Sequence, residues 1–186
     1  MEYVFCSTSV SPRFVYSYFI RKPSLKLRLI NNSHPMRVAV FPGSFDPITK
    51  GHESIVRRSL SLFDEIIIGI GYNNNKHYFF SQDRREHFIN KTFHGEPKIK
   101  VMRYSGLTVD FCKQVGAGFI LRGLRTSADF EFERAIAQMN RSMNHEVETV
   151  FIVSDPALSH VSSTIVRDIL LYQGDVSAFV PDSIKI

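Results

Sequence analysis

The segment Phe41-Pro-Gly-Ser-Phe-Asp-Pro-Ile-Thr-Lys-Gly-His52 joins a short apolar run to a helical pattern. Its two prolines and two glycines predict a turn of defined shape. Glycine lets a backbone come close to a ligand, so Gly43 marks a place where one could bind. His52 falls in the first turn of the helix that follows, where free N–H groups favour anions. An isolated histidine there could equally cap its own helix. The prediction of an anion-binding turn therefore depends on the whole segment and not on His52 alone.

Strand and helix patterns alternate from this turn onward. We expect strands at 37–41, 65–72, 99–104, 119–121 and 149–153, and helices at 51–62, 81–93, 108–115, 127–143 and 162–172. Gly116 or Gly118 is predicted to end the third helix, and Gly174 to follow the last one as its C′ residue. This alternation requires crossover connections, and hence a parallel sheet. The predicted fold is α/β: one Rossmann-like domain with a doubly wound five-stranded parallel sheet and helices on both faces.

The positive charge of the chain lies mainly in its first 35 residues. The formal net charge is +5, but residues 1–35 contain five basic residues and one acidic residue, so residues 36–186 are nearly neutral. We therefore predict no nucleic-acid partner for the domain at 36–186. The leader at 1–35 could be a disordered tail, a transit peptide, or sequence upstream of a true start at Met36. Nucleic-acid binding by the leader is a further alternative.

Two cysteines without metal-ligand spacing fit a reducing compartment. No apolar run approaches the roughly 20 residues that a membrane-spanning helix needs. We expect a cytoplasmic protein without a membrane partner.

Further polar motifs follow the second and fourth predicted strands. Lys76 could pair with a phosphate, although loop lysines are more often solvated. Arg122-Gly-Leu-Arg125 places two arginines around what is predicted to be a glycine turn, where their planar groups could meet phosphates. The alternative is ion pairing with Glu131 or Glu133. Asp129 and Glu133 share one face of the next helix, and that face could be merely solvated, with Arg134 as a partner.

A hydroxyl-rich segment, Ser159-His-Val-Ser-Ser-Thr-Ile-Val-Arg167, follows the last predicted strand. Consecutive hydroxyls at a helix start can cap the helix and surround an anion, whereas capping alone needs only one of them. Ligands of such sheets bind beyond the carboxyl ends of the strands, where the strand order reverses. The motifs therefore predict one phosphate-binding site.

The motifs resemble those of a known enzyme superfamily. Thr49-Lys-Gly-His52 is similar to the (T/H)xGH signature of the nucleotidyltransferases, and Val161-Ser-Ser-Thr-Ile-Val-Arg167 resembles their ISSTxxR signature. The Arg122–Arg125 block and the Asp-Phe-Glu-Phe-Glu that follows are similar to the phosphopantetheine adenylyltransferase family. That resemblance extends from residue 36 to about residue 183. It implies transfer of AMP from ATP to 4′-phosphopantetheine, giving dephospho-coenzyme A and pyrophosphate in coenzyme A synthesis.

The resemblance also implies roles for individual residues. His52 would stabilise the transition state at the α-phosphate, with Lys76 and Arg125 as further catalytic groups. The implied ATP site comprises Ser44, Phe45, His52, Gly123, Leu124, Arg125, Glu133, Leu158, Ser159, His160, Val161, Ser162, Ser163 and Thr164. The implied substrate site comprises Ser44, Lys76, Thr108 and Arg122. The nucleophile would be a phosphate that is already ionised near neutral pH, so no general base is required.

Cofactor and assembly are also implied by the resemblance. Mg²⁺ is expected to bind mainly through the ATP phosphates, because the sequence offers no dedicated carboxylate cage. Family members form hexamers, which makes a homohexamer the expectation. The alternatives are another adenylyl- or cytidylyltransferase, acting on nicotinate mononucleotide, flavin mononucleotide or glycerol 3-phosphate, and a nucleotide sensor that has lost catalysis.

Overall fold

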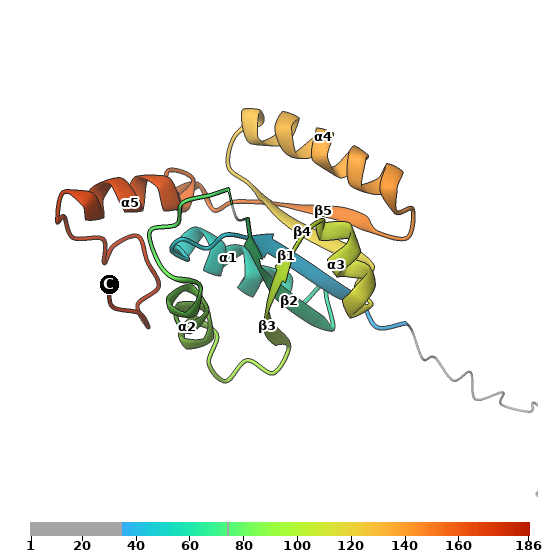
Figure 1. Ribbon diagram of the computed structural model, residues 1–186, viewed down its shortest axis with the longest axis horizontal. Helices are drawn as coiled ribbons and strands as arrows, with labels where there is room; N and C mark the ends of the chain where they lie inside the picture. Colours follow the sequence, from blue (N-terminus) through green and yellow to red (C-terminus); the bar gives the residue numbers. More distant parts are fainter. Residues whose placement is uncertain (1–34, 74) are drawn as a thin grey trace, which may run out of the picture. The chain divides into compact units, whose positions relative to one another are not determined.

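The computed structural model describes residues 35–73 and 75–186 (Figure 1). The predicted basic leader therefore lies, up to residue 34, outside the described residues, and its boundary with the domain stays a prediction. Among the described residues, no helix has the length and apolar character that a membrane crossing needs. The elements are β1 (Val38–Gly43), α1 (Lys50–Ser59), β2 (Glu65–Tyr72), α2 (Gln82–Thr92), β3 (Ile99–Ser105), α3 (Thr108–Val115), β4 (Phe119–Leu124), α4 (Ser127–Met143), β5 (Glu148–Val153), a short 3₁₀ turn (Pro156–Leu158) and α5 (Ser163–Leu171).

The strands form one sheet in the order β3-β2-β1-β4-β5, and all neighbouring strands are parallel. One apolar core packs α1, α2, α5 and the C-terminal segment on one face of the sheet. A smaller core packs α3 on the other face, and α4 contacts α3, β4 and β5 (Figure 1). The predicted doubly wound parallel sheet is confirmed. The strand order reverses between β1 and β4, which is where such folds bind ligands.

Two predicted element ends differ from the structure by three residues, and one of them concerns the site. The helix expected at 51–62 ends at Ser59, since Leu60 is its C-cap residue. The strand expected at 119–121 continues to Leu124, so Gly123 lies in β4 rather than in a turn. A Cβ atom on Gly123 would lie 3.2 Å from Cγ1 of Ile55, so this glycine lets α1 approach the sheet closely.

The glycine predictions at the helix ends had different outcomes. Gly116 caps α3 in the left-handed region at φ 68°, as expected. Gly174 is not the left-handed residue after α5, because Gln173 takes that conformation at φ 56°. Gly174 is required for space, since a Cβ atom there would lie 2.6 Å from Cγ2 of Ile169.

Candidate active site

A cavity of about 340 Å³ lies beyond the carboxyl ends of β1 and β4. Its walls come from the β1–α1 turn, the start of α1, the end of β4, the start of α4 and the segment leading into α5. The predicted site residues that it brings together are Ser44, His52, Arg122, Gly123, Arg125, Glu133, Leu158, Val161, Ser162, Ser163 and Thr164. Segments far apart in sequence thus converge on one space.

The remaining predicted residues do not line this cavity. The Phe45 ring is buried against His52, with ring centroids 5.2 Å apart. Leu124, Ser159 and His160 lie outside the lining, whereas Lys76 and Thr108 line two other cavities. Prediction from the sequence missed some lining residues, of which Thr49 and Asp129 have polar side chains that act in the site. The missed lining residues are Phe41, Pro42, Thr49, Gly51, Ile55, Asp129 and Ser154, whereas Gly43 was singled out as a place of ligand approach.

The β1–α1 turn is shaped by the Phe45 ring. Phe45 lies in the left-handed region at φ 47°, which is unusual for a bulky residue. Its ring covers Gly43, where an added Cβ atom would lie 2.9 Å from Cζ of Phe45. The glycine therefore makes room for an aromatic ring, and it also lines the cavity, so the expectation that a ligand can approach its backbone stays a prediction.

Side chains from three other elements hold the carbonyl groups of this turn. Four side chains donate to these carbonyl groups. Two of them, Ser163 and Arg167, belong to the hydroxyl-rich motif, so this motif supports the turn as well as the cavity wall. The bonds run from Arg122 Nη1 to Pro42 O (3.0 Å), from Arg85 Nη1 to Ser44 O (2.6 Å), from Arg167 Nη1 to Asp46 O (2.7 Å) and from Ser163 Oγ to Pro47 O (2.7 Å). A turn fixed in this way can present its remaining groups in one defined geometry.

His52 both caps α1 and faces the cavity. The backbone N–H of Thr49 donates to His52 Nδ1 at 3.0 Å, and the Thr49 hydroxyl in turn accepts from the His52 N–H at 3.5 Å, which completes a capping box. A backbone N–H can only donate, so Nδ1 carries no proton and Nε2 does. The capping alternative and the phosphate-binding hypothesis are therefore compatible: the cap leaves Nε2–H as a donor.

The surroundings of His52 keep its imidazole neutral. Burial, which has the largest effect, and the charges of Arg125 and then Arg122 together lower the pKa of His52 from 6.5 to about 4. Because the pKa in the folded state is below that of the unfolded chain, this group favours folding above about pH 6.5, and the benefit is lost as the pH falls toward about 4.

We expect an NMR titration of the ligand-free protein to place the His52 midpoint at about 4. In Arg125→Met the midpoint should rise, because one of the two positive charges that oppose protonation has gone. A wild-type midpoint near 6.5 would show that His52 is neither desolvated nor close to the arginines.

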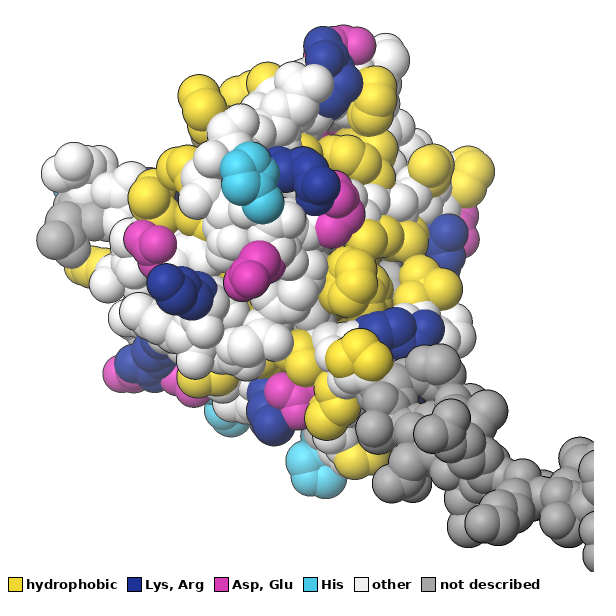
Figure 2. Space-filling model, turned by 90° about the vertical axis from the view of Figure 1, so that its right-hand side faces the viewer, with side chains coloured by type: hydrophobic (Ala, Val, Ile, Leu, Met, Phe, Trp, Pro, Cys, Tyr) yellow, Lys and Arg dark blue, Asp and Glu magenta, His cyan; other side chains and the backbone are white. Residues whose placement is uncertain are grey.

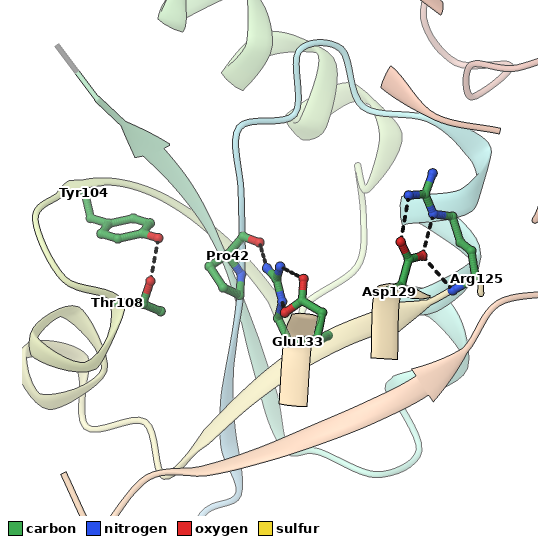
Figure 3. A network of polar contacts seen from close by, with 7 residues as sticks. Pro42, Tyr104, Thr108, Arg125, Asp129 and Glu133 are labelled. Carbon is green, nitrogen blue, oxygen red and sulfur yellow. Dashed lines mark hydrogen bonds and ion pairs between the residues drawn. The ribbon is translucent and has the colours of Figure 1, made fainter. Parts of the chain in front are cut away.

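Each arginine of the Arg122–Arg125 block is held by a carboxylate of α4. Arg122 Nε donates to Glu133 Oε2 at 2.7 Å, and its Nη2 donates to Glu133 Oε1. Arg125 donates from Nε and Nη2 to Asp129 at 3.0 and 3.3 Å, and its backbone N–H donates at 3.1 Å. Figure 3 shows Glu133 beside Pro42 and, further along, Asp129 facing Arg125. The pairing with Glu133 that the sequence left open is thus present for Arg122, whereas Arg125 pairs with Asp129 instead. Both arginines also line the cavity, so phosphate binding stays open as well.

These pairs orient the arginines before any ligand binds. Burial alone would raise the pKa of Asp129, but the bonds from Arg125 outweigh it and hold that pKa below its ordinary value. The carboxylate stays ionised, so the guanidinium of Arg125 is fixed by a charge-assisted bidentate contact. Arg134, the alternative partner for this face, instead pairs with Glu131 at 2.8 Å.

The start of α5 adds backbone donors to the cavity. Ser162 caps the helix by accepting the N–H of Ile165 at 3.2 Å. The N–H groups of Ser163 and Thr164 occupy the first two helical positions, which have no carbonyl partner within a helix. Backbone N–H groups and the helix dipole thus favour an anion here.

Two further predicted residues, Thr108 and Lys76, line other cavities. Thr108 lines a second cavity of about 210 Å³, which shares Arg122 and Glu133 with the first. Its hydroxyl lies 3.0 Å from that of Tyr104 (Figure 3). Lys76 lines a third cavity of about 510 Å³, and its Nζ lies 5.7 Å from the centre of the Tyr78 ring. The structure therefore does not bring Lys76 to His52.

The residues of this site, and the described residues generally, contain no cluster of three or more histidine, cysteine, aspartate or glutamate side chains suited to a metal ion. Asp129 and Glu133, the carboxylates in the main cavity, are both bound to arginines. The face shown in Figure 2 mixes basic side chains with acidic and hydrophobic ones, without a broad basic surface.

Comparisons with known proteins agree with this geometry. Residues 40–169 match the cytidylyltransferase-like family model. A phosphopantetheine adenylyltransferase of Flavobacterium psychrophilum is 53% identical over 151 residues, which cover 81% of this chain and 99% of the relative. The Bacteroides thetaiotaomicron enzyme of the same name is 50% identical over 151 residues, with the same coverage of each chain.

The solved structures that resemble this chain share its fold at low identity. A candidate nicotinate-nucleotide adenylyltransferase from Vibrio parahaemolyticus has a TM-score of 0.60 at 18% identity, covering 78% of this chain and 87% of that protein. A bifunctional NMN adenylyltransferase/ADP ribose pyrophosphatase from Francisella tularensis has a TM-score of 0.63 at 14% identity, covering 80% of this chain and 46% of that protein.

Proposed function

Because the chain belongs to the phosphopantetheine adenylyltransferase family of nucleotidyltransferases, we propose that it transfers AMP from ATP to 4′-phosphopantetheine. The products are dephospho-coenzyme A and pyrophosphate, as coenzyme A synthesis requires. The observation that carries the proposal is the single cavity lined by His52, Arg125 and the start of α5. These groups are hydrogen-bond donors, and a triphosphate is a chain of acceptors.

The chemistry follows from how these donors are arranged. The acceptor phosphate attacks the α-phosphate directly, and pyrophosphate leaves from the opposite side. The neutral His52 donates from Nε2–H to an oxygen on which charge develops, while Arg125 and the first N–H groups of α5 bind the departing phosphates. The nucleophile is ionised already, so no side chain has to remove a proton, and positioning supplies most of the rate.

The second cavity supports a place for the acceptor. Arg122 lies at the junction of the two cavities, where it can bind the acceptor phosphate facing the ATP. The remainder of the acceptor then extends along Thr108, Tyr104 and Ile136, which combine hydroxyl and apolar surface. Lys76 would join the acceptor phosphate only if the β2–α2 connection moved toward His52, and its role remains a proposal.

A panel of acceptors tests this function. The protein is mixed with ATP or CTP, Mg²⁺ and one acceptor, and pyrophosphate release is measured together with the mass of the product. We expect dephospho-coenzyme A from ATP and 4′-phosphopantetheine, and little turnover with nicotinate mononucleotide, flavin mononucleotide or glycerol 3-phosphate. Preferred turnover of one of those acceptors would replace the assignment, and ATP binding without turnover would revive the sensor alternative.

Mg²⁺ is proposed to arrive with ATP. The carboxylates beside the cavity are engaged by arginines, so they provide no dedicated cage. A magnesium ion held by phosphate oxygens and water is compatible with that donor set, and it would reduce the negative charge of the triphosphate. A cytoplasmic location is likewise a proposal.

A homo-oligomer is proposed because α4 leaves large apolar side chains exposed. No residue of this helix is buried, and Phe132 and Met139 are 68% and 64% exposed. Exposed apolar groups on one helix are typical of protein–protein interfaces. We propose the hexamer of the family as the assembly.

We expect Met139→Glu to shift the protein to a smaller species in light scattering after gel filtration, because the new carboxylate would be buried in the interface. Lys91→Glu, on the exposed surface of α2, serves as the matched charge-changing control. Wild-type protein that is monomeric at micromolar concentration would contradict the proposal.

A further inference from the structure

Arg85 is a buried arginine that forms no ion pair among the described residues, although burial lowers its pKa and the nearby charge of Asp46 partly opposes this. Its side chain is completely buried. Its guanidinium lies 4.2 Å from the centre of the Tyr78 ring, and Nε and Nη2 form no hydrogen bond with the described residues. Burying a charge is costly unless it makes a specific contact. The hydrogen bond of Arg85 goes to the carbonyl oxygen of Ser44, at 2.6 Å.

That carbonyl belongs to the peptide group that links Ser44 to Phe45. The bond is trans, so its C=O and its N–H point in opposite directions. Arg85 binds the C=O on the side of α2, which directs the N–H of Phe45 to the other side of the turn. Gly43 and Ser44 line the main cavity, whereas Arg85 lines a separate cavity that shares no residue with it, so we take the side of the turn away from Arg85 to be the cavity side. The Phe45 N–H forms no backbone hydrogen bond among the described residues.

The orientation of this peptide is not the one that Phe45 itself prefers. At φ 47° the Phe45 backbone is in the left-handed region, which is unfavourable for a bulky residue. Rotation of the Ser44–Phe45 peptide by about half a turn would return φ to negative values. It would also replace the N–H that faces the cavity with a carbonyl oxygen, which repels phosphate. Something outside the turn therefore has to hold this peptide.

We propose that Arg85 is a positioning residue that holds the Ser44–Phe45 peptide so that the Phe45 N–H faces the phosphates of ATP. The proposal rests on the proposed adenylyl transfer and adds to it a residue that lies outside the main cavity. Arg85 does this through its bond to the Ser44 carbonyl, from a helix on the far side of the turn. The buried charge is explained, since a charged donor makes a stronger bond to a carbonyl than a neutral one.

The test is Arg85→Met, which keeps the length of the side chain and removes its donors. We expect kcat to fall about tenfold to a hundredfold, somewhat less than the loss of a complete oxyanion donor, because part of the population keeps the native peptide orientation. The KM for ATP should change by no more than about threefold, since the other phosphate donors remain. A crystal structure of the variant should show the Ser44 carbonyl displaced or reversed.

Arg84→Met is the matched control, because Arg84 is the neighbouring residue of α2, stacks on Phe80 and Phe88, and does not reach the turn. It should retain wild-type kcat. A purely structural role of Arg85 would lower the melting temperature and leave kcat per folded molecule unchanged. Unchanged kcat in Arg85→Met, or lowered kcat with the carbonyl in its native place, would overturn the proposal.

If Arg85→Met does not fold, Arg85→Lys replaces it. We expect the bond from the lysine ammonium to the Ser44 carbonyl and a normal kcat to be kept together or lost together. If one were kept without the other, the proposal would be overturned.

The role of Arg85 can also be tested separately from the adenylyl transfer reaction. Inorganic pyrophosphate titrated into the wild type should shift the Phe45 amide resonance, and the shift should be lost in Arg85→Met even if no acceptor is turned over. A shift that is equal in both proteins would count against it.

Discussion

His52→Ala is expected to fold normally and to lose about 10²- to 10³-fold in kcat, with a much smaller change in the KM for ATP. The variant removes a donor from a preorganised site, which corresponds to about 2.7–4 kcal/mol of transition-state stabilisation. Thr49 and the rest of the cap remain, so α1 should still form. Steady-state kinetics with a circular dichroism check of folding will measure this, and His94→Ala, at an exposed position, is the matched control.

Replacement of His52 by glutamine or by asparagine tests which imidazole nitrogen acts as the donor. The Thr49 N–H occupies Nδ1, so the donor to the phosphate has to be Nε2. Glutamine can place an amide N–H near the position of Nε2, whereas asparagine reaches only the position of Nδ1. His52→Gln should therefore retain more activity than His52→Asn. Equal activities, or near-normal turnover in His52→Ala, would remove this imidazole from the mechanism.

Arg122→Met is expected to raise the KM for 4′-phosphopantetheine by about tenfold to a hundredfold, the equivalent of one or two charge-assisted hydrogen bonds. The loss also leaves the Glu133 carboxylate, only 12% exposed, without its partner and close to two phosphates. Repulsion between these anions should add to the effect. Initial rates at saturating ATP measure the change.

The double variant Arg122→Met with Glu133→Gln separates the two causes. It should recover part of the lost affinity, because the unpaired carboxylate is gone, but not all of it, because the phosphate donor is still missing. An acceptor KM that is unchanged in Arg122→Met would place the acceptor phosphate elsewhere, and the second cavity would then have another use.

The order of strands and helices could be predicted because apolar periodicity is a local property of the chain. Local patterns do not show which elements approach one another, and this limited the site. Gly123 looked like a turn residue, because the approach of Ile55 depends on tertiary packing. The pairing of Glu133 with Arg122 also needs α4 to lie over the end of β4, whereas Asp129 pairs with Arg125 only four residues away.

The supporting residues were harder to predict than the lining residues. Arg85 follows another arginine within a helical pattern, where a charged residue is normally solvated, and its burial depends on how α2 meets the β1–α1 turn. The cap on His52 uses a histidine where glutamate or glutamine is usual. Lys76 is the opposite case: its place after β2 suggested the site, but it lines a separate cavity, because the conformation of a loop is not set by its position along the chain. Its role stays a prediction.

Direct transfer at the α-phosphate, carried out by donors around one triphosphate, is the central step of the proposed mechanism. The stereochemical course of the reaction tests this most directly, with ATP made chiral at the α-phosphorus by sulfur substitution and with 4′-phosphopantetheine as acceptor. A single in-line displacement predicts product with inverted configuration at phosphorus. Retention would require two displacements through a covalent adenylyl–enzyme, and it would contradict a site that acts by positioning and charge stabilisation alone.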